Sequence, residues 1–180
     1  MTNSSNGTEP APDAELLKRA ARLRGAVRET FGSVTMAMMA LPRYRHLALA
    51  DLKHLVLEPL IQDRIALAKR AADDGPLADV TGMAIWASVS DEVDAKIREQ
   101  VAAGVFPVRL RAQDWKSGSI NWLLDVIAPD RGAAAAVIAN FKQVAKEGEL
   151  RLHPLVPRLV DKDVLERMGA TKMGERRNDG

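Results

Sequence analysis

The residue whose position most strongly indicates chemistry is Asp125. It lies inside the apolar run 120–128, INWLLDVIA, which has a polar turn before it and Pro129 after it. A run of this length between two breakers is typical of a buried strand. An ionised carboxylate there is costly unless it is paired. We therefore expect Asp125 to serve a reaction, to pair with a nearby Arg, or to face a wet side of the sheet.

The segment 113–130 carries two closely spaced motifs, D-W-x-S-G-x and W-x-x-D-x-I-A-P. In this register the segment resembles the central signature of the RTX toxin-activating lysine acyltransferases, cytoplasmic bacterial enzymes that fatty-acylate protoxin lysines. A string of this kind is far more specific than a lone glycine motif. The resemblance covers roughly residues 30–145. The matching residues are Asp114, Trp115, Ser117, Gly118, Trp122, Asp125, Ile127, Ala128 and Pro129.

An earlier pair of motifs extends the resemblance and also departs from it. The family's first helix carries F/L-G-x-V, which residues 31–34 match, and it runs into S-P-x-H-R/K, whose His is the family's catalytic base. Residues 42–45 keep the Pro and the Arg of that motif. The position of the His is held by Tyr44, and the Ser before the Pro is Leu41.

The departure at Tyr44 bears directly on proton transfer. A lysine amine must be neutral to attack a thioester, and with a pKa near ~10.4 very few lysines are neutral at pH 7. A His can accept the proton, whereas a phenol with a pKa near ~10 is a better proton donor to the leaving thiolate. His46 lies two residues later and is a candidate substitute base, although a lone His beside a helix start is also typical of a surface or capping residue. We therefore expect Asp125 to be the charged partner, with Tyr44 or His46 in the acid/base role.

The resemblance also implies the substrates. The donor is an acyl-acyl carrier protein, which presents a phosphopantetheine thioester, and no cofactor is bound permanently. The acceptor is a lysine of a protein or peptide, such as an RTX protoxin. Arg43 and Arg45 are candidates to contact the phosphopantetheine phosphate or the acidic carrier, and Arg131 is placed to meet an acidic donor. A second copy of the chain, forming a homodimer, is a further candidate partner.

Other charged groups suggest sites that we do not expect. His54 and Glu58 are spaced i,i+4 like half of a metal site, but no third ligand stands at a recognisable spacing, so no metal is predicted. The helix that starts near residue 14 is basic in its first half, which indicates a solvated face or a docking patch for an acidic partner or nucleic acid. The net charge of +2 is small, so nucleic-acid binding is not expected.

Composition and length bound the chain. Its 180 residues predict a single domain over 14–170, which the resemblance implies is acyltransferase-like, with a disordered tail over 1–13 and a flexible tail over 171–180. The chain has no Cys, so disulfides and thiol chemistry are not expected. It has no apolar window long enough to span a membrane and no secretory signal, which predicts a cytoplasmic protein.

The pattern of the remaining residues predicts the elements that position the candidates. Apolar residues spaced three and four apart predict one long helix from Ala14 to Leu41, or two helices with a kink at Gly25 or Gly32, stopped by Pro42. The other predicted elements are a short helix within 41–60 broken at Pro59, a hairpin of 63–70 and 77–89, a helix capped by Ser90 and ended by Gly104, an extended segment 105–113, the strand with Asp125, a helix from Asp130 or Gly132, an edge strand within 149–156 and a short helix 161–168.

This order predicts an α/β sandwich with a mainly antiparallel sheet flanked by helices. The resemblance implies an acetyltransferase-like (GNAT-like) fold, and the predicted order is compatible with it. The function that the resemblance implies is fatty acyl transfer to a protein lysine. The alternative is a non-catalytic relative that keeps the fold, has lost the base, and acts as a binding or regulatory protein.

Overall fold

The computed structural model describes residues 13–68, 82–144 and 149–168. Its centre is a four-stranded mixed sheet of order β1-β2-β3-β4. The strands are β1 (Ile65–Ala68), β2 (Gly82–Val89), β3 (Ile120–Ile127) and β4 (Leu150–Leu152). The first two pairs are antiparallel, and β3 and β4 are parallel. The α/β class is therefore confirmed, with a mixed sheet, and the finer acetyltransferase-like assignment stays a prediction.

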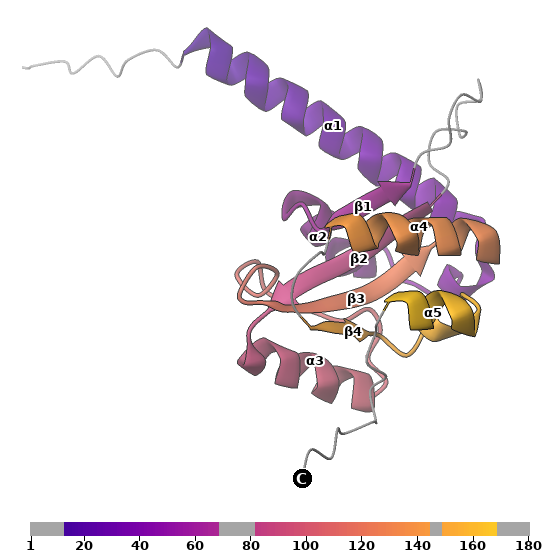
Figure 1. Ribbon diagram of the computed structural model, residues 1–180. Helices are drawn as coiled ribbons and strands as arrows, with labels where there is room; N and C mark the ends of the chain where they lie inside the picture. Colours follow the sequence, from indigo (N-terminus) through magenta and orange to yellow (C-terminus); the bar gives the residue numbers. More distant parts are fainter. Residues whose placement is uncertain (1–12, 69–81, 145–148, 169–180) are drawn as a thin grey trace, which may run out of the picture.

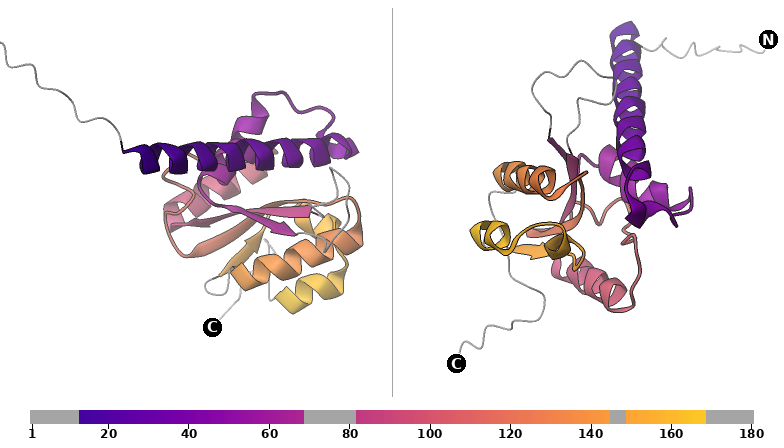
Figure 2. Two further views of the ribbon diagram at one scale, coloured as in Figure 1. Left: turned by 90° about the horizontal axis from the view of Figure 1, so that it is seen from above. Right: turned by 90° about the vertical axis from the view of Figure 1, so that its right-hand side faces the viewer.

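Helices cover both faces of this sheet (Figures 1 and 2). On one face lie α1 (Ala14–Met39) and α2 (Glu58–Ile61), and on the other lie α4 (Arg131–Val144) and α5 (Lys162–Met168). Parallel strands need a crossover, and α4 supplies it between β3 and β4. Each face has its own apolar core, which we call the α1-side core and the α4-side core. The α3 helix (Asp91–Ala102) contributes Val93 and Ile97 to the α1-side core.

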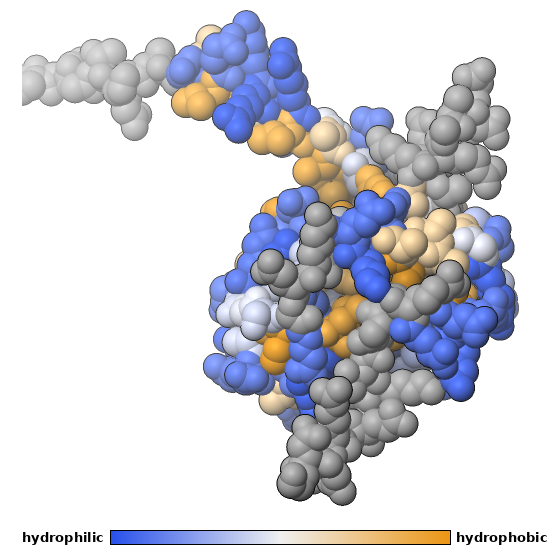
Figure 3. Space-filling model, viewed as in Figure 1, coloured by the Kyte–Doolittle hydropathy of each residue, from blue (hydrophilic) through white to orange (hydrophobic). Residues whose placement is uncertain are grey.

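The α1 helix is continuous through Gly25 and Gly32, so the alternative of two kinked helices is wrong. Among the described residues, packing partners cover only its C-terminal half. Val34 and Met38 are buried there, whereas Leu16 is 63% exposed and Leu23 is 61% exposed. The N-terminal half extends beyond the sheet, and apolar residues line its lower side (Figures 1 and 3). The apolar stripe is therefore real along the whole helix, but within the described residues only half of it is covered.

The segment after α1 differs from the expected single short helix. A 3₁₀ turn (Pro42–Tyr44) comes first, and a helical run then begins at Asp51, passes through a π turn (Lys53–Leu57) and ends in α2. Pro59 lies inside this run, so the predicted break there is wrong. The π turn Lys53–Leu57 stands before it and already interrupts the regular i→i−4 ladder, so the run passes the missing Pro59 N–H without ending.

Most other predicted elements are confirmed with shorter bounds. β1 and β2 form the predicted antiparallel pair, while the predicted turn at Asp74-Gly75-Pro76 lies outside the described residues. The Ser90 side chain accepts a hydrogen bond from the Val93 N–H at 3.4 Å and caps α3, and Gly104 follows that helix with a φ of +70°. Residues 105–113 form no strand.

Two predicted boundaries shift. The late edge strand is three residues long, because only Leu150–Leu152 pair with β3. Asp13, assigned from sequence to the tail, caps α1, since its side chain accepts from the Glu15 N–H at 3.0 Å. Among the helices of the described residues, none has both the length and the apolar content to cross a membrane.

Candidate functional site

The side chains of Tyr44 and Asp125 meet in the α1-side core. The Tyr44 hydroxyl donates to Asp125 Oδ2 at 2.7 Å. Both residues are buried, and Asp125 is only 1% exposed. The interior carboxylate that stands out in the sequence is therefore paired with Tyr44, the residue predicted to take the place of the family's His.

Arg43 completes this cluster. Its guanidinium Nη2 lies 3.2 Å from Asp125 Oδ1, and the same nitrogen donates to the Tyr44 hydroxyl and to the Val126 carbonyl. The guanidinium also stacks 4.5 Å from the centre of the Tyr44 ring. The Val126 N–H donates to Asp125 Oδ1 at 2.8 Å, so the carboxylate has three donors around it. The expectation that Asp125 pairs with an Arg is confirmed.

A β-bulge in β3 decides which face of the sheet Asp125 occupies. The register with β2 pairs Ile85 with Asp125 and Trp86 with Leu123, which leaves Leu124 as an extra residue. Bulges re-aim side chains. Without this one, Asp125 and Leu123 would share a face, and Leu123 belongs to the α4-side core. With it, Asp125 pairs across from Ile85, a residue of the α1-side core, and reaches Tyr44.

The surroundings set the protonation of the pair. Burial raises the pKa of Tyr44 far above its usual value, with the Asp125 charge adding to the effect, so the phenol keeps its proton. Burial also raises the pKa of Asp125, while Arg43, the Tyr44 hydroxyl and the Val126 N–H each pull it back. Tyr44 is thus a hydrogen-bond donor here, and Asp125 is a carboxylate with raised affinity for a proton.

The structure separates the two candidates for the acid/base role. Tyr44 contacts Asp125, whereas His46 is exposed, and no contact between described residues joins it to the carboxylate. The buried imidazole on this side belongs to His153, which the sequence offered no reason to choose. The charge of Asp125 raises the pKa of His153, and burial, the larger effect, lowers it.

His153 arrives beside the cluster through strand pairing. It follows β4, and its backbone N–H donates to the Leu123 carbonyl of β3 at 2.9 Å. Its Nδ1 accepts from the Leu155 N–H at 3.2 Å, so the neutral ring carries its proton on Nε2. In the sequence, His153 directly follows the predicted edge strand within 149–156. That position points to the site only once the pairing of this strand with the Asp125 strand is known.

Most of the other motif residues hold the scaffold. The Trp115 carbonyl accepts from the Ser88 N–H at 3.0 Å, and Ser117 Oγ accepts from the Ser90 N–H at 3.0 Å. The Trp122 indole donates to buried Asp94 at 2.8 Å, which ties β3 to α3. These contacts fix the turn before β3 against the end of β2. Of the motif residues, Asp125 is the one that enters the polar cluster.

A cavity of about 370 Å³ opens beside Arg43. Arg131, a predicted donor contact, lines it, and Arg45 does not; the Arg45 side chain instead donates to the Pro42 carbonyl at 3.0 Å. Arg158, which the sequence analysis did not single out, also lines the cavity. The walls comprise Leu41, Pro42, Arg43, Val126, Ala128, Pro129, Asp130, Arg131, Ala134, Arg158 and Leu159.

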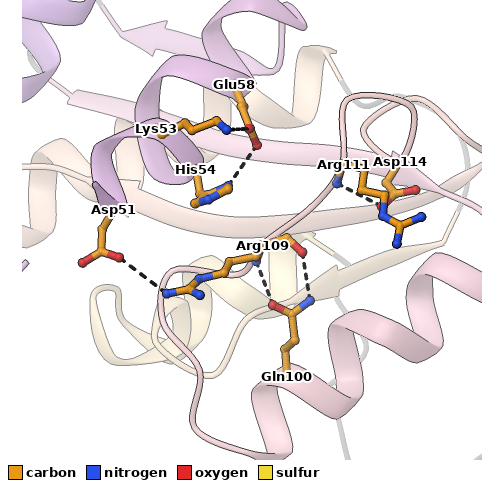
Figure 4. Close-up of polar contacts among 8 residues, drawn as sticks. All are labelled: Asp51, Lys53, His54, Glu58, Gln100, Arg109, Arg111 and Asp114. Atoms are coloured by element: carbon orange, nitrogen blue, oxygen red, sulfur yellow. Dashed lines mark hydrogen bonds and ion pairs between the residues drawn. The ribbon is translucent and has the colours of Figure 1, made fainter. Parts of the chain in front are cut away.

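His54 and Glu58 form a polar contact that belongs neither to the Tyr44–Asp125 cluster nor to the lining of the cavity. His54 Nδ1 and Glu58 Oε2 are 3.1 Å apart, and Lys53 lies 3.8 Å from the same carboxylate (Figure 4). Nearby, Arg109 pairs with Asp51 at 3.8 Å. The described parts of the chain contain no group of three or more His, Cys, Asp or Glu side chains that could hold a metal ion.

Comparison with known proteins gives one clear match. The model of a family described as the RTX toxin acyltransferase family matches residues 24–156 of the 180, which is more than half of the chain. The matched region includes the 3₁₀ turn with Tyr44, the bulged strand β3 and His153. The search of curated proteins finds no match.

Proposed function

The chain belongs to the RTX toxin acyltransferase family, and from that premise we propose that it moves a fatty acyl group from acyl carrier protein to a lysine amine of a toxin-like protein. The observation that carries this proposal is the 2.7 Å hydrogen bond between Tyr44 and Asp125. A carrier-protein donor, an RTX protoxin as acceptor, a cytoplasmic location and a homodimer remain predictions that come with the family. No permanently bound cofactor is needed for this reaction.

In this proposal Tyr44 and Asp125 act together as a proton relay. The lysine nitrogen attacks the thioester carbonyl, a C–N bond forms and the C–S bond breaks. The amine gives a proton to the Tyr44 oxygen while the phenol passes its own proton to Asp125, whose pKa is raised by burial. The reverse transfer then protonates the leaving thiolate. The phenol never carries a full negative charge, which suits its strongly raised pKa.

Arg43 has an electrostatic role in this scheme. It is half-buried, it contacts both members of the relay, and it is the member of the cluster that lines the cavity. A guanidinium beside the thioester carbonyl stabilises the oxyanion that forms on attack. Because Arg43 lines the cavity and contacts Tyr44, which does not line it, the scheme requires the Arg43 side chain to shift when the donor enters. His46 has no role in the scheme.

The test is acylation of a candidate acceptor by purified protein and acyl-acyl carrier protein, followed by mass spectrometry. Asp125→Asn keeps the shape of the side chain but cannot take the relayed proton, so we expect lysine acylation to fall by roughly 10²- to 10⁴-fold. Glu29→Gln, which changes an exposed carboxylate on α1, serves as the control and should keep full activity. Intact acylation by Asp125→Asn would show that the relay is wrong.

A second candidate function follows from the same cluster. Tyr44 donates to Asp125 and both are buried behind Arg43, which is also the arrangement expected of a non-catalytic relative that only binds carrier protein or toxin. Tyr44→His restores the residue type of the family's base and separates the two functions. Acylation that appears only in the variant identifies a binding protein, whereas acylation by the unaltered protein identifies an enzyme with its own relay.

A further inference from the structure

The cavity beside Arg43 has an apolar wall and a small set of charged side chains. Seven of its eleven lining residues are apolar or proline: Leu41, Pro42, Val126, Ala128, Pro129, Ala134 and Leu159. The other four are charged, namely three arginines and Asp130. An apolar wall with a few well-placed polar groups is the usual composition of a small-molecule site, and about 370 Å³ lies within the usual range of pocket volumes.

The three arginines differ in how strongly they are held. Arg43 is occupied by Asp125, Tyr44 and the Val126 carbonyl, although its Nε is buried without a hydrogen-bond partner. Arg131 pairs with Asp161 at 2.6 Å, but both side chains are about two-thirds exposed or more, and such exposed pairs contribute little. Among the described residues, no carboxylate forms an ion pair with Arg158, which is exposed.

The exposed lining residues of the cavity and the buried ones differ in charge. Arg131 and Arg158 are exposed, whereas Val126 and Ala134 are buried, so we infer that the two arginines lie on the solvent side of the cavity and the two apolar residues on its inner side. Arg43 also lines it and contacts the Tyr44–Asp125 pair. Asp130 does not offset the arginines fully, since its carboxylate accepts from the Ala133 N–H at 2.8 Å as the first turn of α4 begins. An anion is therefore favoured at the opening and an uncharged chain further in.

We propose that this cavity binds the phosphopantetheine arm of the acyl donor, with Arg131 and Arg158 holding the phosphate and the apolar wall holding the pantetheine chain. The thioester end of the arm then lies toward Arg43 and the Tyr44–Asp125 pair. This inference rests on the proposed function and adds Arg158 as a donor-binding residue. It also places Arg45, an expected phosphate contact, outside the site. Arg131 exchanges its exposed carboxylate partner for the phosphate at little cost.

Direct binding tests this without turnover. The full-length protein is titrated with phosphopantetheine and with pantetheine, which lacks only the phosphate, by calorimetry at fixed salt. We expect phosphopantetheine to bind about tenfold more tightly or better, because guanidinium–phosphate hydrogen bonds are charge-assisted. The preference should shrink as salt is raised, since the guanidiniums are exposed.

Two variants locate the phosphate and one controls for general charge. Arg158→Gln and Arg131→Gln should each reduce the preference for phosphopantetheine by about tenfold, the loss of one charge-assisted contact. Arg22→Gln, an exposed Arg on the N-terminal half of α1, should leave it unchanged. Thermal melts followed by circular dichroism confirm that all three variants are folded.

The inference is overturned if the two ligands bind equally, if neither binds at millimolar concentration, or if the preference survives in both cavity variants. A fatty acid that competes better than phosphopantetheine would overturn it as well, because the cavity would then hold the acyl chain. These results are independent of acyl transfer. If the protein acylates lysine but shows no preference for phosphopantetheine, the proposed function stands and this inference is wrong. If it prefers phosphopantetheine through Arg131 and Arg158 but transfers no acyl group, this inference stands and the proposed function is wrong.

Discussion

At the scale of residues, the interior carboxylate is stable because its neighbours are donors. Arg43, the Tyr44 hydroxyl and the Val126 N–H surround Asp125, so the charge is paired and hydrogen-bonded despite its burial. In the predicted alignment Tyr44 takes the place of the family's His, and it keeps one feature of that residue, the ability to hydrogen-bond the Asp. It changes another, since the phenol holds its proton at neutral pH. Asp125 is therefore the proton acceptor that the cluster offers.

His153 gives a prediction on stability at this scale. Its pKa is lowered by burial from an ordinary value of 6.5. Below that value the unfolded chain binds a proton that the folded chain does not, so stability from this group is lost as pH falls through the window beneath 6.5. We expect urea-denaturation midpoints of the protein to fall with pH in this window, and to fall less steeply in His153→Asn.

The comparison of the protein with His153→Asn has a reference point at pH 8. At pH 8 the imidazole is neutral in both states, so the difference between the two proteins there measures only the packing that the substitution removes. Asn keeps an oxygen able to accept from the Leu155 N–H. Parallel pH profiles for the two proteins would mean that His153 does not titrate on unfolding. The raised pKa of Asp125 contributes a slope of the opposite sign, and it cancels only in part in the difference, because His153 itself lowers the pKa of Asp125.

At the scale of elements, the turn before β3 determines where the strand begins. At the end of β2, the Ser88 N–H donates to a carbonyl of the turn 115–118 and the Ser90 N–H donates to a side-chain oxygen of the same turn. In the opposite direction, the Gly118 N–H donates to the Ser88 carbonyl at 3.2 Å. A Cβ on Gly118 would lie 2.5 Å from the Val89 carbonyl oxygen and 2.6 Å from the Ser90 nitrogen. The glycine of the motif is therefore required by the close approach of two backbone segments.

Two glycine substitutions test this explanation. Gly118→Ala should destabilise the protein by about 2 kcal/mol or more, because backbone atoms must move to admit the methyl group. Gly25→Ala should stabilise it by about 1 kcal/mol, since Gly25 is inside α1 and nothing lies within 4 Å of the added Cβ. Both values come from urea-denaturation curves. Equal effects of the two substitutions would contradict the steric role of Gly118.

At the scale of the whole molecule, one sheet joins two apolar cores. β2 and β3 supply residues to both, for example Ile85 and Trp122 on the α1 side and Trp86 and Leu123 on the α4 side. A strand shared in this way cannot lose one core without exposing the other. The N-terminal half of α1 lies outside this arrangement, with its apolar side uncovered in the described part of the chain (Figure 3).

We therefore expect residues 14–170 to unfold as one cooperative domain. Scanning calorimetry of the full chain should give a single transition with calorimetric and van't Hoff enthalpies that agree. Far-ultraviolet circular dichroism and tryptophan fluorescence should report the same midpoint, since Trp86 lies in one core and Trp122 in the other. Two separate transitions, or midpoints that differ between the probes, would divide the predicted domain.

The sequence by itself determined most of the elements and singled out two members of the site, Asp125 and Tyr44. Short-range patterns are legible because capping, helix period and breakers act within a few residues, which is why α1, α3, β3 and α4 begin and end near their predicted positions. Asp125 stood out as a carboxylate inside an apolar run, and Tyr44 stood out by its position in a short motif, so both were found from neighbouring residues alone. The uncovered half of α1 and the run through Pro59 were missed, because covering partners and the π turn are not local properties of the chain.

Only the tertiary structure decided how the site is assembled. A single extra residue in β3 moves Asp125 to the face where Tyr44 lies, and no periodicity in one strand reveals the register with its neighbour. The parallel pairing of β3 with β4 brings His153 to the cluster from 28 residues further along the chain. Contacts between distant segments depend on strand pairing and packing, and a sequence read residue by residue contains neither.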